Sequence, residues 1–324
     1  MTADNVWQPG ASPVLMQRRA RMLNQLRAFF AQQGVLEVET PILNRTTVTD
    51  VHIDSIPASP DAAGGYLQTS PEYAMKRLLA AGSGAIYQVC KVFRAGEAGR
   101  HHNPEFSMLE WYRPGFDHHA LIDEVDALVR ELLADELPLE ATRKFSYREL
   151  FRQYLQLDPW QASIADLQQV ARAYQIEVVS HDEMDRDGWL DLLLTHLIEP
   201  QMPANRPVFV YDYPASQAAL ARLHEQDAVT VASRFELYIN GLELANGYHE
   251  LCDAREQRRR FEQDRQQRQQ LGMIVPEPDE KLLAALEAGL PDCAGVALGL
   301  DRLLMLATGS DDIRQVISFS FERL

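Results

Sequence analysis

The sequence predicts an α+β fold in which an antiparallel sheet is flanked by helices and carries a helical insertion. Apolar residues recur at helical spacing near both ends of the chain and through most of residues 117–206. Short β-rich runs lie before and after that stretch, and two of them are joined by Asn240-Gly241, a dipeptide typical of two-residue hairpins. Runs of strands separated by runs of helices indicate α+β architecture.

The first third of the chain predicts a helix, a strand and a hairpin with a long tip. Ser12-Pro13 is typical of a helix start, and Gly34 of the residue that follows a helix end. A strand is expected at 35–40, where Pro41 ends it. The expected order then continues with a loop at 44–66, a helix at 71–81, a strand at 86–93, a loop at 95–104 and a strand at 106–112.

The remainder predicts a helical stretch and a return to strands. A helix at 117–137 precedes Ser146, which forms a capping-box pattern with Glu149 and opens another helix. Further strands are expected at 208–212, 234–238, 242–247 and 295–299, and further helices at 253–271, 279–288 and 301–307. Because no Gly/Ser-rich linker flanks residues 117–206, we expect one domain spanning 1–324 with that stretch as a helical insertion.

Composition is that of an ordinary globular protein. Of the 324 residues, 46% are apolar and 24% charged, and the net charge of −16 argues against binding nucleic acid mainly through basic surface. No apolar run approaches the roughly 18 residues of a membrane span, so no membrane partner is expected. The N-terminal residues lack the pattern of a signal peptide. Three cysteines without CxxC spacing indicate a reduced, cytoplasmic chain.

Three separated stretches carry the chemistry, although each alone is a weak signal. The first is Gly34-Val-Leu-Glu-Val-Glu-Thr-Pro41. The second joins Val92-Phe-Arg94, His102-Asn-Pro-Glu-Phe106 and Met108-Leu-Glu-Trp-Tyr112, and the third is Gly295-Val-Ala-Leu-Gly-Leu-Asp-Arg302. In this order they resemble the three signature motifs of class II aminoacyl-tRNA synthetases, and most closely the lysyl, aspartyl and asparaginyl subgroup.

Shorter stretches make the chain most similar to lysyl-tRNA synthetase. They are Ser70-Pro-Glu-Tyr73, Lys76-Arg77, and Glu243-Leu-Ala-Asn-Gly247 with Glu250. The similarity covers roughly residues 34–113 and 208–324, and the helical middle is much less alike. It implies a catalytic core that uses ATP and Mg²⁺. It also implies a homodimer formed through the first motif, with Glu37 and Glu39 at the interface.

The residue types in these motifs suit the activation of a carboxylate by ATP. That reaction brings two anions together, so it needs fixed cations near the α-phosphate. Arg94 and Arg302 fit because a guanidinium binds phosphate through two parallel hydrogen bonds. Gly299 lets a ligand approach the start of the last helix. Carboxylates at Glu243 and Glu250 suit Mg²⁺ that is also bound to ATP phosphates.

The resemblance implies a role for each matching residue. Arg94 and Arg302 are the expected catalytic residues. The expected ATP contacts are Arg94, Ala95, Gly96, Asn103, Glu243, Leu244, Gly299 and Arg302. The expected amino-acid contacts are Ser70, Pro71, Glu72, Tyr112 and Glu250, and the expected metal ligands are Glu243 and Glu250. By their charge alone, Glu72, Glu110 and Glu250 suit a substrate ammonium equally well, so both roles stay open for Glu250.

The chain departs from a tRNA synthetase near its N-terminus. Only 33 residues precede Gly34, too few for the OB-fold anticodon-binding domain of lysyl-type enzymes, so no tRNA charging is expected. This combination resembles the lysyl-tRNA synthetase paralogues that modify bacterial elongation factor P. The resemblance implies that (R)-β-lysine is activated as an adenylate and passed to a lysine side chain of elongation factor P. An amino-acid sensor and a free amino-acid ligase remain as alternatives.

Two motif positions also depart from the family pattern. The second motif usually reads Phe-Arg-x-Glu, with the glutamate on the adenine amino group, but here Gly96 occupies that position and Glu97 follows it. Either Glu97 reaches the adenine, or the backbone at Ala95 and Gly96 holds it. Ala297 replaces a glycine of the third motif, and its methyl group is expected to disfavour α-lysine by crowding an α-ammonium.

Two charged patterns outside the motifs are interpreted as solvated surface. His118-His119 has no cysteine or carboxylate at metal-ligand spacing, so it indicates a solvated helix start. The arginines at 255, 258, 259, 260, 265 and 268 are interleaved with acidic residues, which is typical of a solvent-exposed helix face.

Overall fold

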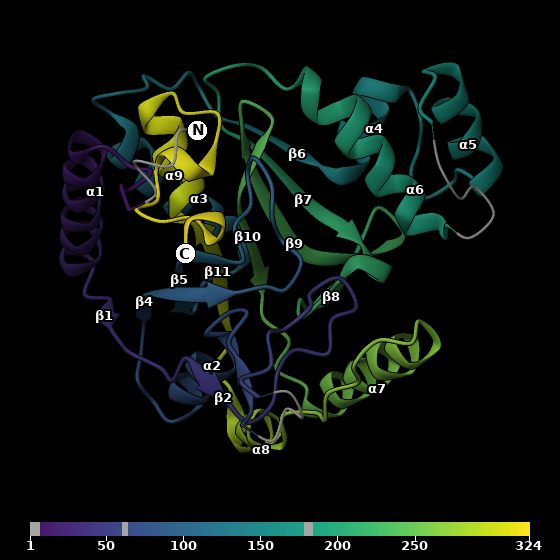
Figure 1. The fold of residues 1–324 in the computed structure, drawn as a ribbon. Helices are drawn as coiled ribbons and strands as arrows, with labels where there is room; N and C mark the ends of the chain where they lie inside the picture. Colours follow the sequence, from purple (N-terminus) through teal and green to yellow (C-terminus); the bar gives the residue numbers. More distant parts are fainter. Residues whose placement is uncertain (1–6, 60–63, 178–183) are drawn as a thin grey trace.

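The computed structural model describes residues 7–59, 64–177 and 184–324, and within them a nine-stranded sheet forms the centre of the fold (Figure 1). Its strands in spatial order are β1 (Leu36–Glu37), β4 (Ile86–Phe93), β5 (Glu105–Pro114), β11 (Cys293–Gly299), β10 (Leu242–His249), β9 (Val229–Ile239), β7 (Val208–Pro214) and β6 (Arg143–Ser146), and β8 (Leu223–Gln226) pairs with β9. A separate small sheet joins β2 (Leu43–Asn44) and β3 (Tyr66–Leu67).

The large sheet is antiparallel in its centre and parallel at both edges. The strands from β4 to β7 pair antiparallel, as predicted, but β1 is parallel to β4 and β6 is parallel to β7. A parallel pair needs a crossover connection, which is usually helical. The first crossover contains α2 (Glu72–Ala80), and the second contains α4 (Tyr147–Leu155), α5 (Ile164–Ala173) and α6 (Arg186–Leu193). Most of the helical middle of the chain is therefore the connection from β6 to β7.

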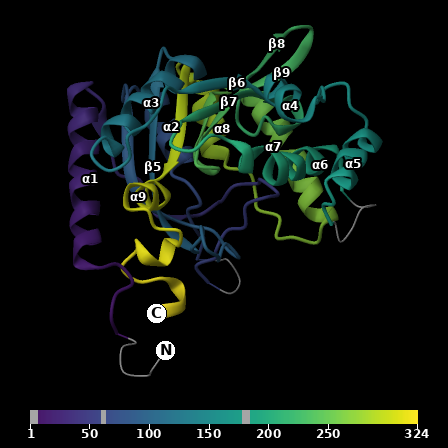
Figure 2. The ribbon, with the colours of Figure 1, turned by 90° about the horizontal axis from the view of Figure 1, so that it is seen from above.

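Three groups of helices pack around the sheet (Figures 1 and 2). The helices α1 (Pro13–Gln32), α3 (His118–Leu133) and α9 (Leu300–Thr308) cover one face, where Trp111 and Val296 join the largest apolar cluster. The helices α2, α7 (Ala254–Gln270) and α8 (Glu280–Gly289) form a smaller cluster with Tyr112 on the opposite side. The third group, α4 to α6, packs against β7. Between the last two groups, part of the sheet carries polar side chains instead of an apolar layer.

Local sequence signals are confirmed at a cap and a turn. Ser146 and Glu149 form a reciprocal capping box at the start of α4. Asn240 and Gly241 both have positive φ, 55° and 69°, as a type I′ hairpin between β9 and β10 requires. The strand expected at 35–40 is shorter than predicted. Only Leu36–Glu37 pairs, because the chain leaves the edge of β4 after a last backbone hydrogen bond at Val38.

Parts of three expectations lie outside the described residues: 1–6 of the N-terminal segment, 60–63 of the first long loop, and 178–183 of the helical stretch. Among the described residues, no helix is both long enough and apolar enough to cross a membrane. The cysteines are free thiols at Cys90, Cys252 and Cys293.

Candidate active site

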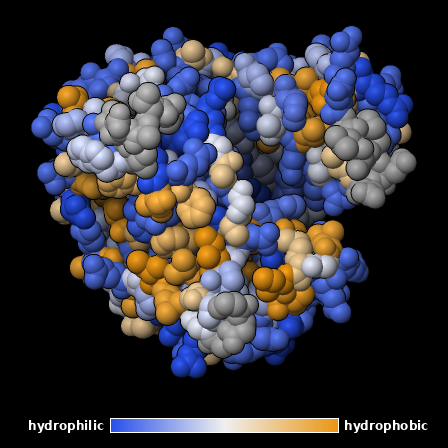
Figure 3. Space-filling view, viewed as in Figure 1, coloured by the Kyte–Doolittle hydropathy of each residue, from blue (hydrophilic) through white to orange (hydrophobic). Residues whose placement is uncertain are grey.

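Two rows of mostly polar or small side chains cross the free part of the sheet. Strand register places Glu110, Ala297, Asn246 and Glu236 side by side on β5, β11, β10 and β9. The next row contains Tyr112, Gly295, Tyr248 and Arg234. Because side chains alternate along a strand, both rows face away from the largest apolar cluster. They line a cavity of about 870 Å³, which opens toward the hollow seen in Figure 3.

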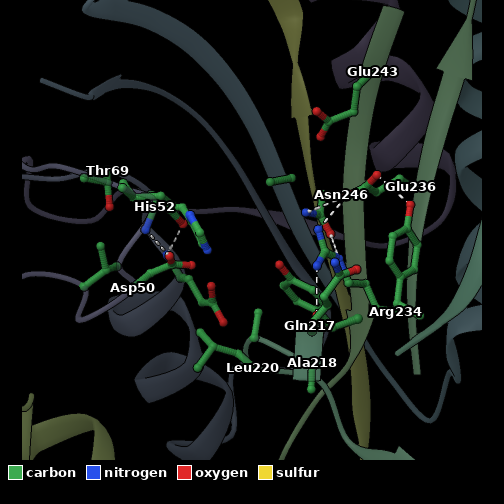
Figure 4. A pocket seen from close by; sticks show the side chains of 18 of the residues that line it. Asp50, His52, Thr69, Gln217, Ala218, Leu220, Arg234, Glu236, Glu243 and Asn246 are labelled. Atoms are coloured by element: carbon green, nitrogen blue, oxygen red, sulfur yellow. Dashed lines mark hydrogen bonds and ion pairs between the residues drawn. The ribbon is translucent and has the colours of Figure 1, made fainter. Parts of the chain in front are cut away.

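A bulge in β10 determines which of its side chains reach this cavity. The pairing with β9 shifts between Glu243 and Ala245, so Leu244 is the extra residue, and its side chain joins the apolar core. Without the bulge, Glu243 and Asn246 would point to opposite faces, since they are three positions apart. Both instead line the cavity (Figure 4). Leu244, an expected ATP contact, borders the cavity, although it also belongs to the apolar cluster on the other face of the sheet.

One end of the cavity is cationic. Arg302, in the first turn of α9, donates to the backbone oxygen of Glu243 (2.8 Å), and its Nη2 lies 2.7 Å from Nε2 of His102. Burial and the charge of Arg302 lower the pKa of His102, so its neutral ring can accept this hydrogen bond. Arg94, at the end of β4, is ion-paired with Glu97 (3.5 Å) and lines the same end. The two arginines expected to be catalytic therefore come together from separate elements.

Asn103 and Gly299 both lie at this cationic end, but the side chain of Asn103 is already hydrogen-bonded, whereas the space beside Gly299 is open. The amide of Asn103 donates to the backbone oxygen of Glu105 (2.7 Å) and accepts from the N–H of Phe321 (3.0 Å). Its side chain therefore fixes the loop after β4. Gly299 precedes α9, and a methyl group added there would meet nothing closer than Arg302 at 3.8 Å. This space is open to a ligand.

The loop geometry bears on which groups face adenine. The N–H of Ala95 donates to the backbone oxygen of Asp54 (2.8 Å), and the oxygen of Gly96 accepts from Ala98 (3.0 Å). These two backbone groups are already used within the fold. The carboxylate of Glu97 instead lines the cavity. Of these three residues Glu97 alone lines the cavity, where it is also paired with Arg94, and both ways of holding adenine stay predictions.

The other end of the cavity is acidic. Glu110 accepts hydrogen bonds from the hydroxyls of Tyr112 (2.7 Å) and Ser70 (2.7 Å). Burial and the nearby charge of Glu72 raise the pKa of Glu110 to about 8. The expected amino-acid contacts Ser70, Glu72 and Tyr112 are thus brought together, and Pro71 lies buried at the start of α2 beside them.

A buried lysine joins the acids of this end. Nζ of Lys76 lies 2.6 Å from Oε1 of Glu72 and 2.5 Å from Oε2 of Glu250. The side chains of Lys76 and Glu250 are each 1% exposed. Burial raises the pKa of Glu250 to about 7, although the charge of Lys76 opposes this shift. Lys76 lies in a stretch that resembles lysyl-tRNA synthetase, but the resemblance assigns it no role.

The expected metal ligands Glu243 and Glu250 do not share a site. They lie at opposite ends of β10, and strand residues at about 3.3 Å each separate them by roughly 20 Å. One ion bound by both carboxylates does not fit this structure, because Mg²⁺ lies about 2 Å from each ligand oxygen. Glu243 has Glu236 and Glu199 as acidic neighbours instead: burial and the charge of Glu236 raise its pKa, and burial and the charge of Glu243 raise the pKa of Glu199 to about 7.

The helical connection from β6 to β7 forms a side wall of the cavity. This role was not predicted from the sequence. A π-helical turn (Leu194–Ile198) and a 3₁₀ turn (Glu199–Gln201) follow α6. They bring Thr195 and Glu199 to the cavity, where the threonine hydroxyl donates to the carboxylate (3.3 Å). Single π turns occur frequently at functional sites. No feature of the apolar spacing indicates this turn.

A polar network on β9 was also not predicted from the sequence. Oε2 of Glu236 accepts from the hydroxyls of Tyr213 (2.6 Å) and Tyr238 (2.5 Å), and Arg234 donates to Glu236 and to the backbone of Gln217 (Figure 4). Counting back from the Asn240-Gly241 turn with period two would have placed 234, 236 and 238 on one face. The hairpin signal therefore contained this information.

Two residues interpreted as solvated surface are buried. Nε2 of His118 lies 3.1 Å from Oδ1 of Asp212 on β7, so the start of α3 is packed against the sheet. Arg268 donates to the backbone oxygens of Asp50 (2.6 Å) and Ile53 (3.3 Å) and holds a loop that borders the cavity. The interpretation was wrong for these two residues, because neighbours in sequence do not reveal partners from distant segments. His119, Arg255, Arg258 and Arg259 are exposed, as expected. Within the described residues, no cluster of three or more His, Cys, Asp or Glu side chains is arranged to hold a metal ion.

Comparisons with known proteins agree with the motif resemblance. The model of a family described as tRNA synthetases class II (D, K and N) matches residues 9–323. Proteins named elongation factor P–(R)-β-lysine ligase from Klebsiella pneumoniae subsp. pneumoniae, Salmonella paratyphi A and Salmonella dublin are 48%, 47% and 47% identical to this chain. Each alignment covers 100% of this chain and 100% of the relative. The chain belongs to the class II tRNA synthetase family of the D, K and N group.

Proposed function

We propose that the protein is an ATP-dependent ligase that activates (R)-β-lysine as an adenylate and transfers it to a lysine side chain of elongation factor P. The observation that carries the proposal is the two-ended cavity. Arg94 and Arg302 offer one end to phosphate, and Glu72, Glu110 and Glu250 offer the other to ammonium groups. Relatives named for this activity match the whole chain at 47–48% identity.

In the first step, an oxygen of the amino-acid carboxylate attacks the α-phosphorus of ATP. The bond between the α-phosphorus and the bridging oxygen breaks, and pyrophosphate leaves. Arg94 and Arg302 stabilise the negative charge that gathers at the α-phosphate. The acids at the other end orient the amino acid so that its carboxylate points toward the arginines. Ala297 and Gly299 separate the two ends with little bulk, so both substrates can lie over β11.

In the second step, the acceptor lysine, as a neutral amine, attacks the carbonyl carbon of the adenylate. An amide bond forms, the bond from that carbon to the phosphate oxygen breaks, and AMP leaves with the electron pair. The amine nitrogen loses its extra proton to water. The product is an amide, which resists mild base, whereas an aminoacyl ester on tRNA does not.

Mg²⁺ fits the arginine end of the cavity. Glu243 and Glu199 present carboxylates there, whereas the oxygens of Glu236 are already hydrogen-bonded, and Mg²⁺ usually takes one or two carboxylates together with phosphate oxygens and water. Bound at these residues, the ion would neutralise charge on the ATP phosphates. This assignment leaves Glu250 to the amino acid, in keeping with its position beside Glu72 and Lys76.

The proposal includes a homodimer, a single catalytic domain and a cytoplasmic reaction. Around the first motif, Leu36, Ile42 and Leu43 are 57%, 43% and 54% exposed, and a second copy would cover this apolar surface. The strands before and after the helical connection, β6 and β7, are neighbours in the same sheet as the rest of the chain. This arrangement supports a single domain. A cytoplasmic location suits a reaction on a translation factor.

ATP–pyrophosphate exchange with (R)-β-lysine and with α-lysine tests the first step, and mass spectrometry of elongation factor P tests the second. We expect exchange that depends on β-lysine and a base-stable mass increase on the factor. Labelling of tRNA through a base-labile ester, with none on the factor, would overturn the proposal. Exchange without transfer to the factor would favour a free amino-acid ligase, and binding without exchange would favour an amino-acid sensor.

A further inference from the structure

Lys76 is an unexpected residue in a pocket for ammonium groups. It extends from α2 into the acidic end of the cavity, and its side chain is 1% exposed. Burying a charged group is costly unless it is paired, and here Glu72 and Glu250 pair with it at 2.6 Å and 2.5 Å. An apolar residue would fill the same volume without this requirement. The lysine is therefore better explained by the charge and geometry of the pocket than by packing.

The formal charge of the pocket matches a diamino acid when Lys76 is included. Counted as ionised, Glu72, Glu110 and Glu250 supply three carboxylates and Lys76 supplies one ammonium, which leaves a formal charge of −2. The pKa of Glu110 is raised to about 8, so this carboxyl reaches its charged form when an ammonium group binds beside it and lowers the pKa again. A diamino acid brings two ammonium groups, while its carboxylate faces the nucleotide. Without Lys76, the pocket would hold one more negative charge than the substrate neutralises.

Lys76 also fixes the direction of the Glu250 carboxylate. Oε2 of Glu250 lies 2.5 Å from Nζ of Lys76. The other oxygen, Oε1, lies beside Gly295, only 2.6 Å from the position that a methyl group on Gly295 would take. Since Gly295 belongs to the cavity floor, Oε1 faces the space that the amino acid enters. The lysine thus occupies one oxygen and presents the other.

We propose that Lys76 is a positioning residue that favours the charged form of Glu250 and directs its free oxygen into the cavity, so that the pocket selects an amino acid with two ammonium groups. The inference rests on the proposed function and deepens it. Lys76 touches neither reacting atom; it acts through Glu72 and Glu250.

Electrostatics within the pocket support this role. Burial and the charge of Glu72 together raise the pKa of Glu250 to about 7, although the charge of Lys76 and its contact with the carboxylate oppose the shift. The titratable groups that face Glu250 come from α2, β5, β11 and the segment after β10: Glu72, Lys76, Glu110, Tyr112, Cys293 and Cys252. Among these, Lys76 supplies the positive charge. An opposite charge at this distance lowers a carboxyl pKa by about 1–3 units, so without Lys76 the carboxyl would be mostly neutral at pH 7.

The test compares Lys76→Met, which removes the charge, with Arg77→Met, which removes a charge from the exposed side of the same helix. ATP–pyrophosphate exchange is measured between about pH 6 and about pH 9. We expect Lys76→Met to raise KM for β-lysine about tenfold or more at pH 7, with KM for ATP within about twofold of normal. The deficit should shrink as pH rises and Glu250 ionises. Arg77→Met should behave like the unmodified protein.

Three outcomes would overturn the inference: an unchanged KM for β-lysine in Lys76→Met, a deficit that is the same at every pH, or an equal loss for ATP. If Lys76→Met gives no cooperative thermal transition, Lys76→Gln takes its place, since its amide can still donate to a carboxylate without bringing charge. The same shift in KM is expected and the same outcomes count against it.

The preference between two amino-acid substrates provides an independent test of the inference. The preference for β-lysine over its analogue with methyl in place of the side-chain ammonium should shrink in the variant, and an unchanged preference would contradict the inference. Failure of the unmodified protein to exchange with any diamino acid would instead refute the proposed function. The two failures are therefore distinguishable.

Discussion

A methyl group at Gly295 should close the amino-acid end of the cavity and leave the nucleotide end intact. In Gly295→Ala the new carbon would overlap the ring of Tyr112 and lie 2.6 Å from Oε1 of Glu250. The ring must then move, and the 2.7 Å hydrogen bond from Tyr112 to Glu110 is disturbed. Overpacking of this kind costs about 1–3 kcal/mol. At about 1.4 kcal/mol per factor of ten, KM for the amino acid should rise roughly 5- to 150-fold.

Gly299→Ala is the matched control on the same strand and the same face. There the nearest atom is Cβ of Arg302 at 3.8 Å, an ordinary contact, so the fold should accept the methyl group. Any effect should fall on KM for ATP. The assay is ATP–pyrophosphate exchange with each substrate varied in turn, alongside thermal unfolding to compare stability. Equal losses for both substrates in Gly295→Ala, or the same pattern in both variants, would refute the two-ended cavity.

Three further variants probe charge, selectivity and pH. Arg302→Ala should lower adenylate formation on the order of 10²–10³-fold while the thermal transition persists, and near-normal pyrophosphate exchange would contradict its role. Ala297 lies on the cavity floor between Glu110 and Asn246. Ala297→Gly should raise kcat/KM for α-lysine relative to that for β-lysine by about 10–200-fold. An unchanged ratio would show that the methyl group does not set the preference. Burial and the charge of Glu72 raise the pKa of Glu110 to about 8, compared with an unfolded value of 4.5. Between these two pH values the folded chain keeps a proton on Glu110 that the unfolded chain releases. The stability that this proton contributes is therefore lost as pH rises from 4.5 to 8. Glu110→Gln should therefore lose less stability than the unmodified protein over that range, and parallel pH dependences of Tm would count against the shift.

The sequence predicted most elements of the fold because the signals that define them are local. The Asn240-Gly241 turn and the capping box at Ser146 depend on the backbone preferences of a few neighbouring residues. The parallel edges of the sheet were not predicted, because the pairing of β1 with β4 and of β6 with β7 joins segments separated by helical crossovers. The burial of His118 has the same origin, since its partner Asp212 lies on a distant strand.

The residues of the site could be predicted where a sequence motif contains them, but not where tertiary contacts bring residues from distant segments together. Arg94 and Arg302 line the same cavity, as the motif resemblance implied, and their catalytic role stays a prediction. The metal roles of Glu243 and Glu250 stay predictions, and β10 holds the two residues too far apart to bind one ion together. Glu236, which register brings near Glu243, lies on another strand, and Glu199 reaches the cavity through a π turn with no counterpart in the apolar pattern.

The central position of β11 has a consequence for how the protein folds during synthesis. This strand carries Gly295, Ala297 and Gly299, yet it is translated after β5 and β10, the two strands it joins. Until Gly299 has left the ribosome, both neighbours present an unpaired edge, and the largest apolar cluster remains open at Trp111. Such long-range closure slows folding and lengthens the time during which aggregation competes. Chains interrupted before Cys293 should therefore accumulate as aggregates, and nascent chains of this length should be favoured targets for chaperones that bind exposed apolar segments.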